Sequence, residues 1–213
     1  MWALVPVKRL AASKSRLASV LSPGQRVELM CRMLEDVLHA LRCALSVKKI
    51  VVLSNERCIE GVLAGVERRA EAEEGDVNRS LAAAVANMPF TAQRVLILPA
   101  DVPDVRADDI DALAAAHQGG LLVCPAIVDG GTNALLSSLP LEIPLHFGER
   151  SFARHLRAAR QRGVVVQTML RPALARDIDR PTDLDWLADP PHVGRAATYV
   201  RSLRGELSER EAG

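Results

Sequence analysis

Six short runs of β-branched and aliphatic residues limit the folds open to this sequence more than any other feature. Most are apolar at every position rather than at alternate positions, which is typical of strands covered on both faces. The runs are WALVPV (2–7), KKIVVLS (48–54), RVLILP (94–99), LLVCPAI (121–127), TNALLS (132–137) and VVVQTM (164–169). Helical patterns lie between several of them. This alternation predicts a three-layer α/β/α sandwich with a mixed, mostly parallel sheet.

The clearest helical segment begins at Ser22. Ser22 can cap a helix, Pro23 suits its first turn, and Gln25 completes a capping-box pattern ahead of a regular apolar face. A second helix is expected at about 108–117, with acidic residues in its first turn, and a third at about 150–162.

The length of 213 residues suits one domain of ordinary size. No repeat or linker divides the chain before Pro190–Pro191, so we expect a single domain over residues 1–190. The tail, residues 191–213, has a weak apolar stripe that predicts a helix packed on the domain or on a partner subunit. A frayed end is the alternative, and a homodimer is left open.

Charge and cysteine content narrow the function classes. Lys and Arg number 27 against 26 Asp and Glu, a balance that argues against a nucleic-acid or membrane binder. No apolar run is long enough to span a bilayer, and the start lacks a secretory pattern. The four cysteines show no CxxC pairing and are interpreted as reduced core thiols. We therefore expect a cytoplasmic protein that acts on small substrates. These cysteines are Cys31, Cys43, Cys58 and Cys124.

Three acidic residues follow apolar segments where ligands are expected. Asp101 comes directly after RVLILP, and ligands of open α/β sheets bind beyond the carboxyl ends of the strands. Asp177 and Asp179 point the same way along an extended segment, with Ile178 directed into the core. Three converging carboxylates would repel one another, and Mg²⁺ would relieve that repulsion. A loop or helix cap is the alternative for Asp101 alone. The other acidic residues nearby are interpreted as turn and first-turn residues: Asp104, Asp108 and Asp109.

A basic group lies near the N-terminus, after the first predicted strand. Lys8 follows the strand, and Lys14 and Arg16 open a short helix. Phosphates are bound by such donors at strand-to-helix turns. The loop matches neither GxGxxG nor GxxxxGK[ST], which disfavours ordinary dinucleotide and P-loop binding. A solvated basic surface is the alternative.

A third region combines DGGTNALLSS with HFGERSF. Gly130 and Gly131 permit close backbone approach, and Thr132 adds a hydroxyl; Gly148 and Ser151 lie at the start of the third helix, where free N–H groups favour anions. A hairpin turn and a helix cap are the alternatives. The two isolated histidines nearby, His146 and His155, are interpreted as structural or pocket-lining, and no nucleophilic triad is evident.

Taken together, these motifs resemble the 2-phospho-L-lactate guanylyltransferase family of coenzyme F420 biosynthesis, whose members also use phosphoenolpyruvate or 3-phosphoglycerate. The resemblance spans residues 2–188. The combination of GGTNALL, FG-x-x-S and DID is specific, whereas PADVP is shared with many nucleotidyltransferases. The motifs, in order, are VPVK, KSRLA, VN at 77–78, LPADVP, GGTNALL, FGERSF and DIDRPTDL.

The resemblance implies a nucleotidyltransferase fold like that of molybdenum-cofactor and nucleotide-diphospho-sugar transferases. It implies Mg²⁺ on Asp101, Asp177 and Asp179, and GTP across Asn78 and the N-terminal loop. It places the phospho-acid at positions matching Thr132, Gly148 and Ser151, with His146 as a weaker candidate for selecting the acid. The product would pass to a downstream enzyme of F420 biosynthesis. The loop residues assigned to GTP are Lys8, Lys14 and Arg16.

Some positions depart from the family pattern. Val77 replaces a usual Leu, and Arg180 follows DID where Thr is common. Two alternatives stay open. Another nucleotidyltransferase would be expected to carry a glycine-rich N-terminal loop, which this chain lacks. A non-catalytic nucleotide-binding module would be expected to lose one of the three Asp residues, and none is lost.

Overall fold

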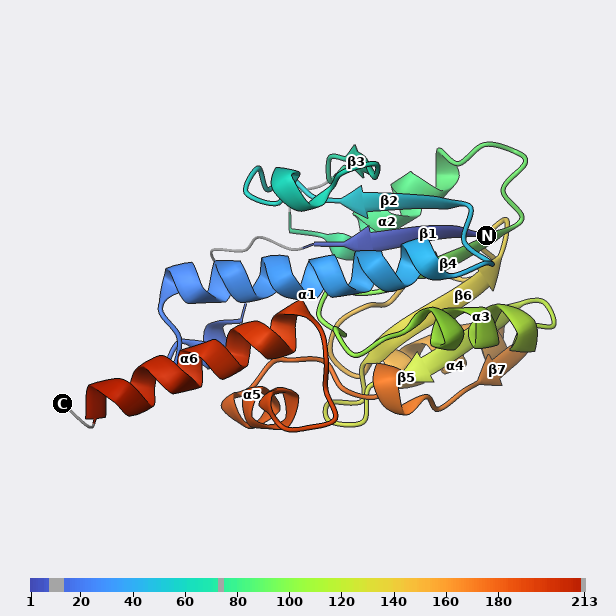
Figure 1. Cartoon of the computed structure of the whole chain (residues 1–213). Coiled ribbons are helices and arrows are strands. Elements are labelled where there is room, and N and C mark those ends of the chain that lie inside the picture. Colours follow the sequence, from blue (N-terminus) through green and yellow to red (C-terminus); the bar gives the residue numbers. More distant parts are fainter. Residues whose placement is uncertain (8–13, 73–74, 212–213) are drawn as a thin grey trace.

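A seven-stranded sheet forms the centre of the computed structural model, which describes residues 1–7, 14–72 and 75–211 (Figure 1). In the last helix, side chains are described as far as Gly205. Lys8, a predicted phosphate ligand, lies outside the described residues. The strands are β1 Trp2–Pro6, β2 Lys49–Leu53, β3 Glu67–Arg69, β4 Arg94–Ile97, β5 Leu121–Pro125, β6 Thr132–Ser138 and β7 Val166–Thr168. The α-helices are α1 Pro23–Cys43, α2 Val77–Ala86, α3 Ala107–Ala116, α4 Ser151–Gln161, α5 Pro181–Ala188 and α6 Arg195–Glu211.

The strand order is β3-β2-β1-β4-β6-β5-β7. Among the described strands, β6 alone runs antiparallel to its neighbours, β4 and β5. The prediction of a mixed, mostly parallel sheet is confirmed. The chain passes from β1 to β2 and β3 on one side and then crosses to β4 on the other. Ligands bind at such a switch point, outside the carboxyl ends of the strands.

Helices cover both faces of the sheet, so the predicted three-layer sandwich is also confirmed. In β1, Ala3 and Val5 join a core with α1, α3, α5 and α6, while Leu4 joins a second core with α2 and α4. The central strands β1, β2, β4, β5 and β6 thus bury both of their faces, because successive side chains point to opposite sides. This double burial is the reason that the strands lack polar alternation.

The three predicted helices are present. Ser22 and Gln25 form the predicted capping box: the Ser22 hydroxyl accepts from the Gln25 backbone, and the Gln25 side chain accepts from the Ser22 N–H. The observed bounds of α3 and α4 lie within one residue of the expected ranges.

Three elements were not predicted, and each has weak local features. β3 is an edge strand of three charged residues, Glu67–Arg69, without an apolar run. α2 is alanine-rich, and its cap is Asp76, whose side chain accepts from the N–H groups of Asn78 and Arg79. α5 has only eight residues. Packing against the rest of the fold stabilises such short elements more than propensity does.

The residues after Pro191 form helix α6 over Arg195–Glu211, which lies against α1 and α5 (Figure 1). Its apolar face is buried in the larger core through Ala196, Ala197 and Val200. The carboxylate of Asp36 on α1 accepts from the first N–H groups of α6, at 2.9 Å to both Arg195 and Ala196. This contact caps the helix and ties it to α1.

The prediction of core thiols is correct for one cysteine and wrong for two. Cys124 is buried in β5, Cys31 is half-buried, and Cys43 and Cys58 are exposed, all as free thiols. The exposed pair lie in the last turn of α1 and in the loop after β2, where the chain leaves the core.

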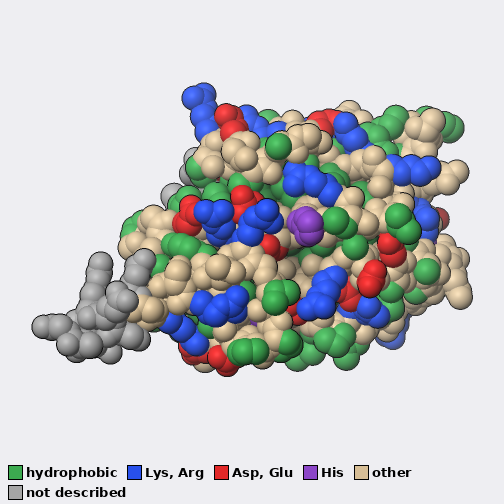
Figure 2. Space-filling view, viewed as in Figure 1, with side chains coloured by type: hydrophobic (Ala, Val, Ile, Leu, Met, Phe, Trp, Pro, Cys, Tyr) green, Lys and Arg blue, Asp and Glu red, His purple; other side chains and the backbone are tan. Residues whose placement is uncertain are grey.

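The molecular face formed by α1 and α6 mixes basic and acidic side chains (Figure 2). Arg32 on α1, for example, pairs with Glu28 and Glu35, and Arg195 on α6 also contacts Glu35. Among the described helices, none combines the length and apolar character needed to cross a membrane.

Candidate active site

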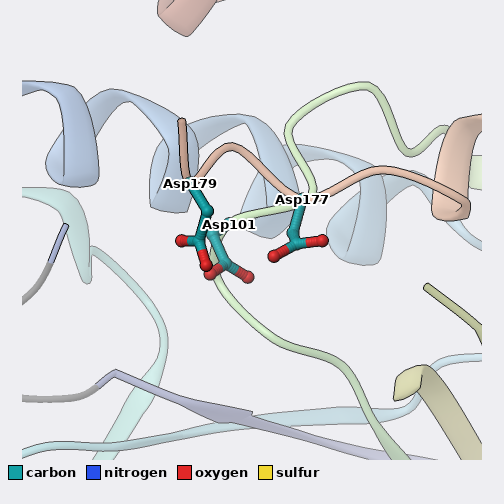
Figure 3. A group of neighbouring side chains, drawn as sticks. All are labelled: Asp101, Asp177 and Asp179. Carbon is teal, nitrogen blue, oxygen red and sulfur yellow. The ribbon is translucent and has the colours of Figure 1, made fainter. Parts of the chain in front are cut away.

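The three predicted metal ligands meet at one point. Asp101 follows β4, and Asp177 and Asp179 come from the segment before α5; one carboxylate oxygen of each lies within 4.8 Å of the others (Figure 3). Ile178 between them is fully buried, and its N–H donates to the Asp101 carbonyl oxygen at 3.0 Å. The predicted alternation, with two Asp side chains on one side and Ile178 in the core, is confirmed.

A buried carboxylate holds the backbone of this segment in place. Asp183, in the first turn of α5, is 3% exposed. Its Oδ2 accepts from the N–H groups of Asp179 and Arg180 at 3.0 and 2.7 Å. Sequence reasoning overlooked this residue, although DRPTD has the spacing of a capping box. Asp183 therefore orients Asp179 toward Asp101.

Lys14 lies among the acidic residues, a position that the sequence did not reveal. Its ammonium nitrogen donates to Asp101 Oδ2 at 2.7 Å and to Asp179 Oδ1 at 2.5 Å. Burial alone would lower the pKa of Lys14, but attraction and hydrogen bonds from the two carboxylates outweigh it and raise that pKa. Arg16 is mostly exposed, and its Nη1 lies 3.6 Å from Asp179 Oδ2. We call Asp101, Asp177, Asp179 and Lys14 the acidic cluster.

The acidic cluster suits a hard divalent cation. Burial, and then the negative charges of Asp101 and Asp179, raise the pKa of Asp177 to about 6. Three carboxylates with one buried ammonium retain excess negative charge, and all three offer oxygen donors, which Mg²⁺ prefers. The residues present therefore fit the cation that the family resemblance implies.

A second group of polar side chains is neutral and buried. The Ser151 hydroxyl donates to Thr132 Oγ1 at 3.1 Å, and His155 Nδ1 lies 3.1 Å from the same oxygen. The His146 N–H donates to His155 Nε2 at 2.9 Å. All three side chains are 5% exposed or less. We call Thr132, Ser151 and His155 the hydroxyl–imidazole cluster.

The two glycine-containing motifs lie side by side at this cluster. The Phe152 N–H donates to the Gly130 carbonyl oxygen at 3.2 Å, and the Ser151 N–H donates to Gly148 at 3.1 Å. Gly130 and Gly148 have φ values of 69° and 124°, a region that L side chains rarely adopt. A Cβ at Gly148 would meet no atom within 4 Å, so its backbone borders open space.

Asn78 on α2 contacts the loop before α4, and His146 lies in that loop. The Asn78 amide donates to the Phe147 carbonyl oxygen at 3.0 Å and accepts from the Phe147 N–H at 2.6 Å. Asn78 thereby holds the loop before α4. His146 Nδ1 lies 3.4 Å from a guanidinium nitrogen of Arg154. Burial, and then the Arg154 charge, lower the pKa of His146.

The DGGT loop borders the acidic cluster as well. Val128 and Asp129 line a small hollow together with Asp177, Asp179 and Arg16. Asp129 Oδ1 accepts from the Gly131 N–H at 2.7 Å, which stabilises the tight turn before Thr132. The loop therefore links the predicted metal ligands to the predicted phospho-acid residues.

A larger hollow, of about 900 Å³, lies elsewhere between α1, the start of α3 and α6. It shares no residue with either cluster. Its charged side chains include Arg32 and Arg195, which are paired with Glu35, and Asp36, which caps α6. The acidic and hydroxyl–imidazole clusters are therefore the stronger candidates for chemistry.

Comparison with known families identifies the chain's relatives. The family described as guanylyl transferase CofC like matches residues 1–212. The chain belongs to this family. A phosphoenolpyruvate guanylyltransferase of Roseiflexus castenholzii is 40% identical over 204 residues, covering 95% of each chain. A 2-phospho-L-lactate guanylyltransferase of Methanothermobacter thermautotrophicus is 34% identical, covering 95% of this chain and 90% of the relative. A 3-phospho-D-glycerate guanylyltransferase of Phenylobacterium zucineum is 33% identical, covering 95% and 96%.

Solved structures support the predicted nucleotidyltransferase fold. A crystal structure from Desulfovibrio desulfuricans G20, named after the nucleotide-diphospho-sugar transferases, has a TM-score of 0.80 at 17% identity, covering 98% of this chain and 96% of that one. A nucleotidyl transferase from Methanothermobacter thermautotrophicus has a TM-score of 0.66 at 17% identity, covering 94% and 98%. At these identities the likeness concerns the fold alone.

Proposed function

We propose that this protein transfers GMP from GTP to a three-carbon phospho-acid, with release of pyrophosphate, in coenzyme F420 biosynthesis. The observation that carries the proposal is the convergence of Asp101, Asp177 and Asp179 beside a DGGT loop, in a chain of the guanylyl transferase family. The three relatives named above act, by their names, on phosphoenolpyruvate, 2-phospho-L-lactate and 3-phospho-D-glycerate.

In this proposal Asp101, Asp177 and Asp179 hold Mg²⁺. Bound there, the cation would neutralise the negative charge of the triphosphate and of the departing pyrophosphate. Lys14 and Arg16 add positive charge at the same edge of the sheet. Lys8 and Asn78 remain proposed nucleotide contacts.

A phosphate oxygen of the acid attacks the α-phosphorus of GTP, and the bond from that phosphorus to the oxygen bridging the β-phosphorus breaks. Because the attacking phosphate is already an anion, no general base is required. The chain's own residues need only hold two anionic substrates close together and in line. We assign the acid to Thr132, Ser151 and the backbone at Gly148, where a helix N-terminus favours anions. His146, at the mouth of this site, is proposed to influence which acid fits.

The test is an assay of pyrophosphate release with GTP, Mg²⁺ and each of the three acids in turn. We expect release with GTP and at least one acid, and little release when CTP or ATP replaces GTP or when EDTA removes the metal. Release with a sugar phosphate but with none of the acids would contradict the proposal. Full activity in the presence of EDTA would contradict the assignment of Mg²⁺ to the three Asp residues.

A further inference from the structure

His155 has a defined protonation state because of one backbone contact. The ring is fully buried on α4, and its Nε2 is 2.9 Å from the His146 backbone nitrogen. A backbone N–H can only donate, so Nε2 must be the acceptor and carry no proton. A neutral imidazole then carries its proton on Nδ1, which lies 3.1 Å from Thr132 Oγ1. Burial, and then the His146 and Arg154 charges, lower the pKa of His155 to about 4, which keeps the ring neutral.

This tautomer sets the direction of the hydrogen bonds that follow. Thr132 and Ser151 have two hydroxyl protons between them, and their mutual bond at 3.1 Å uses one. His155 donates to Thr132, so the ring cannot accept the other proton. With the opposite tautomer, the ring would accept a proton from Thr132 instead. As the structure stands, the hydroxyl pair keeps one proton to donate outward.

An outward donor matches the substrate class proposed above. At neutral pH, the phosphate and carboxylate oxygens of a phospho-acid are mainly hydrogen-bond acceptors. Thr132 follows Gly131 in the DGGT loop, and Ser151 begins α4 beside Gly148, so both hydroxyls lie where the acid is assigned. A donor fixed in direction before the ligand arrives costs less entropy on binding than a freely rotating hydroxyl.

We propose that His155 is a positioning residue that makes the Thr132–Ser151 pair a hydrogen-bond donor to the phospho-acid. The inference rests on the proposed function and deepens it, because it assigns a role to a histidine that makes no direct contact with substrate. It also gives the His146 backbone a role, since that N–H selects the tautomer.

Steady-state kinetics with GTP and the preferred acid test this role. His155→Phe keeps a planar ring but loses both ring hydrogen bonds, and we expect it to raise KM for the acid about 10-fold while KM for GTP changes less than about twofold. His155→Asn offers an amide N–H near the Nδ1 position and should recover part of this loss. In a Thr132→Val background, His155→Phe should cause little further change, because the two residues act through one hydroxyl.

His192→Phe is the matched control. His192 is a largely buried histidine whose contacts, Asp104 and Trp186, belong to neither cluster. Its loss can lower the melting temperature but should leave both KM values unchanged. Equal increases in the two KM values for His155→Phe, or a full additional effect in the Thr132→Val background, would overturn the proposal.

A second readout does not depend on activity or on the folding of a variant. ¹⁵N NMR of the wild-type protein should show His155 as the Nδ1–H tautomer, without titration above about pH 5. An Nε2–H tautomer, or titration near pH 6.5, would overturn the role of His155 even if the enzyme transfers GMP as proposed. Wild-type protein that neither binds nor guanylylates any of the three acids would overturn both proposals.

Discussion

The acidic cluster and the hydroxyl–imidazole cluster lie at the same edge of the sheet but differ in charge and in exposure to solvent. Asp101 follows β4 and Thr132 begins the antiparallel β6 beside it, so both face the same end. The acidic cluster gathers like charges that are partly exposed, with side-chain exposures of 25% for Asp101 and 34% for Asp179. The hydroxyl–imidazole cluster is neutral, and each of its side chains is 5% exposed or less. The charge of the acidic cluster suits a cation, and the hydroxyl–imidazole cluster is proposed to offer a fixed hydrogen-bond donor to an anion.

The comparison also shows two ways of tolerating polar groups inside a fold. Burial, and then repulsion from Asp101 and Asp179, raise the pKa of Asp177, so repulsion among carboxylates persists in the acidic cluster. In the hydroxyl–imidazole cluster each described bond satisfies a partner, so burial costs little. We therefore expect ligand binding to stabilise the acidic cluster more than the hydroxyl–imidazole cluster. We also expect mutations in the two clusters to change different measured quantities.

The largest effect is expected from removing charge in the acidic cluster. Asp101→Asn and Asp179→Asn should each lower kcat by about 10³-fold or more, because each removes a charged oxygen donor from the metal site. The fold should survive, because the amide keeps the shape and relieves repulsion. Asp108→Asn, an exposed change in the first turn of α3, is the control. Near-normal turnover of both variants at saturating Mg²⁺ would contradict the assignment.

In the hydroxyl–imidazole cluster the effect should appear in KM for the acid. Thr132→Val and Ser151→Ala each remove one hydroxyl of the hydrogen-bonded pair that is proposed to donate to the anion, a contact worth about 1.5–3 kcal/mol, or roughly 10- to 150-fold in KM. KM for GTP should stay nearly constant. Ser137→Ala on the same strand removes a buried hydroxyl that donates to the neighbouring Ser138 carbonyl oxygen, and serves as the control. If KM for GTP rises instead, the two substrates have been placed the wrong way round.

Lys14 pairs with Asp101 and Asp179 within the acidic cluster, and it is also a proposed contact of the nucleotide. Lys14→Met should raise KM for GTP about 10-fold through loss of a charge-assisted contact. It should also lower the melting temperature in EDTA, because Asp101 and Asp179 lose their buried partner. Added Mg²⁺ should then raise the melting temperature of the variant more than that of the wild type. Lys49→Met, which breaks an exposed pair with Glu67, is the control. Equal responses to Mg²⁺ would count against this role.

The last effect concerns the pH dependence of stability and isolates the hydroxyl–imidazole cluster. The folded pKa of His155, about 4, lies below the ordinary 6.5, so the unfolded chain binds the proton first as pH falls. Stability from a neutral His155 is complete above about pH 6.5 and is lost toward pH 4. Between pH 7 and pH 5 the loss should be about 2 kcal/mol in the free energy of unfolding. Asp177 contributes with the opposite sign in this range.

Asp177 contributes equally to the wild type and to His155→Phe, so comparing the pH dependence of the two proteins cancels its contribution. The variant should be less stable at pH 7, yet its free energy of unfolding should fall less between pH 7 and pH 5 than that of the wild type. Urea unfolding at both pH values measures the difference. Parallel pH profiles for the two proteins would show that His155 is not held neutral in the fold.

Much of the fold followed from local pattern. The apolar runs predicted six strands, five of which bury both of their faces, and the capping box of α1 is a local arrangement of Ser22 and Gln25. The alternation around Ile178 placed Asp177 and Asp179 on one side. β3, α2 and α5 were not predicted, because short, charged or alanine-rich segments carry little local information.

By itself, the sequence determined six of the seven described strands, the main helices and the motifs from which the family can be predicted, since each depends on neighbours a few residues apart. The tertiary structure alone decided which further side chains join the predicted ones. Lys14 contacts Asp101 and Asp179 across 87 and 165 residues. The backbone N–H of His146 fixes the tautomer of His155, and that tautomer makes His155 Nδ1 the donor to Thr132 Oγ1. Such contacts depend on strand order and on the burial that excludes water, neither of which is encoded in local spacing.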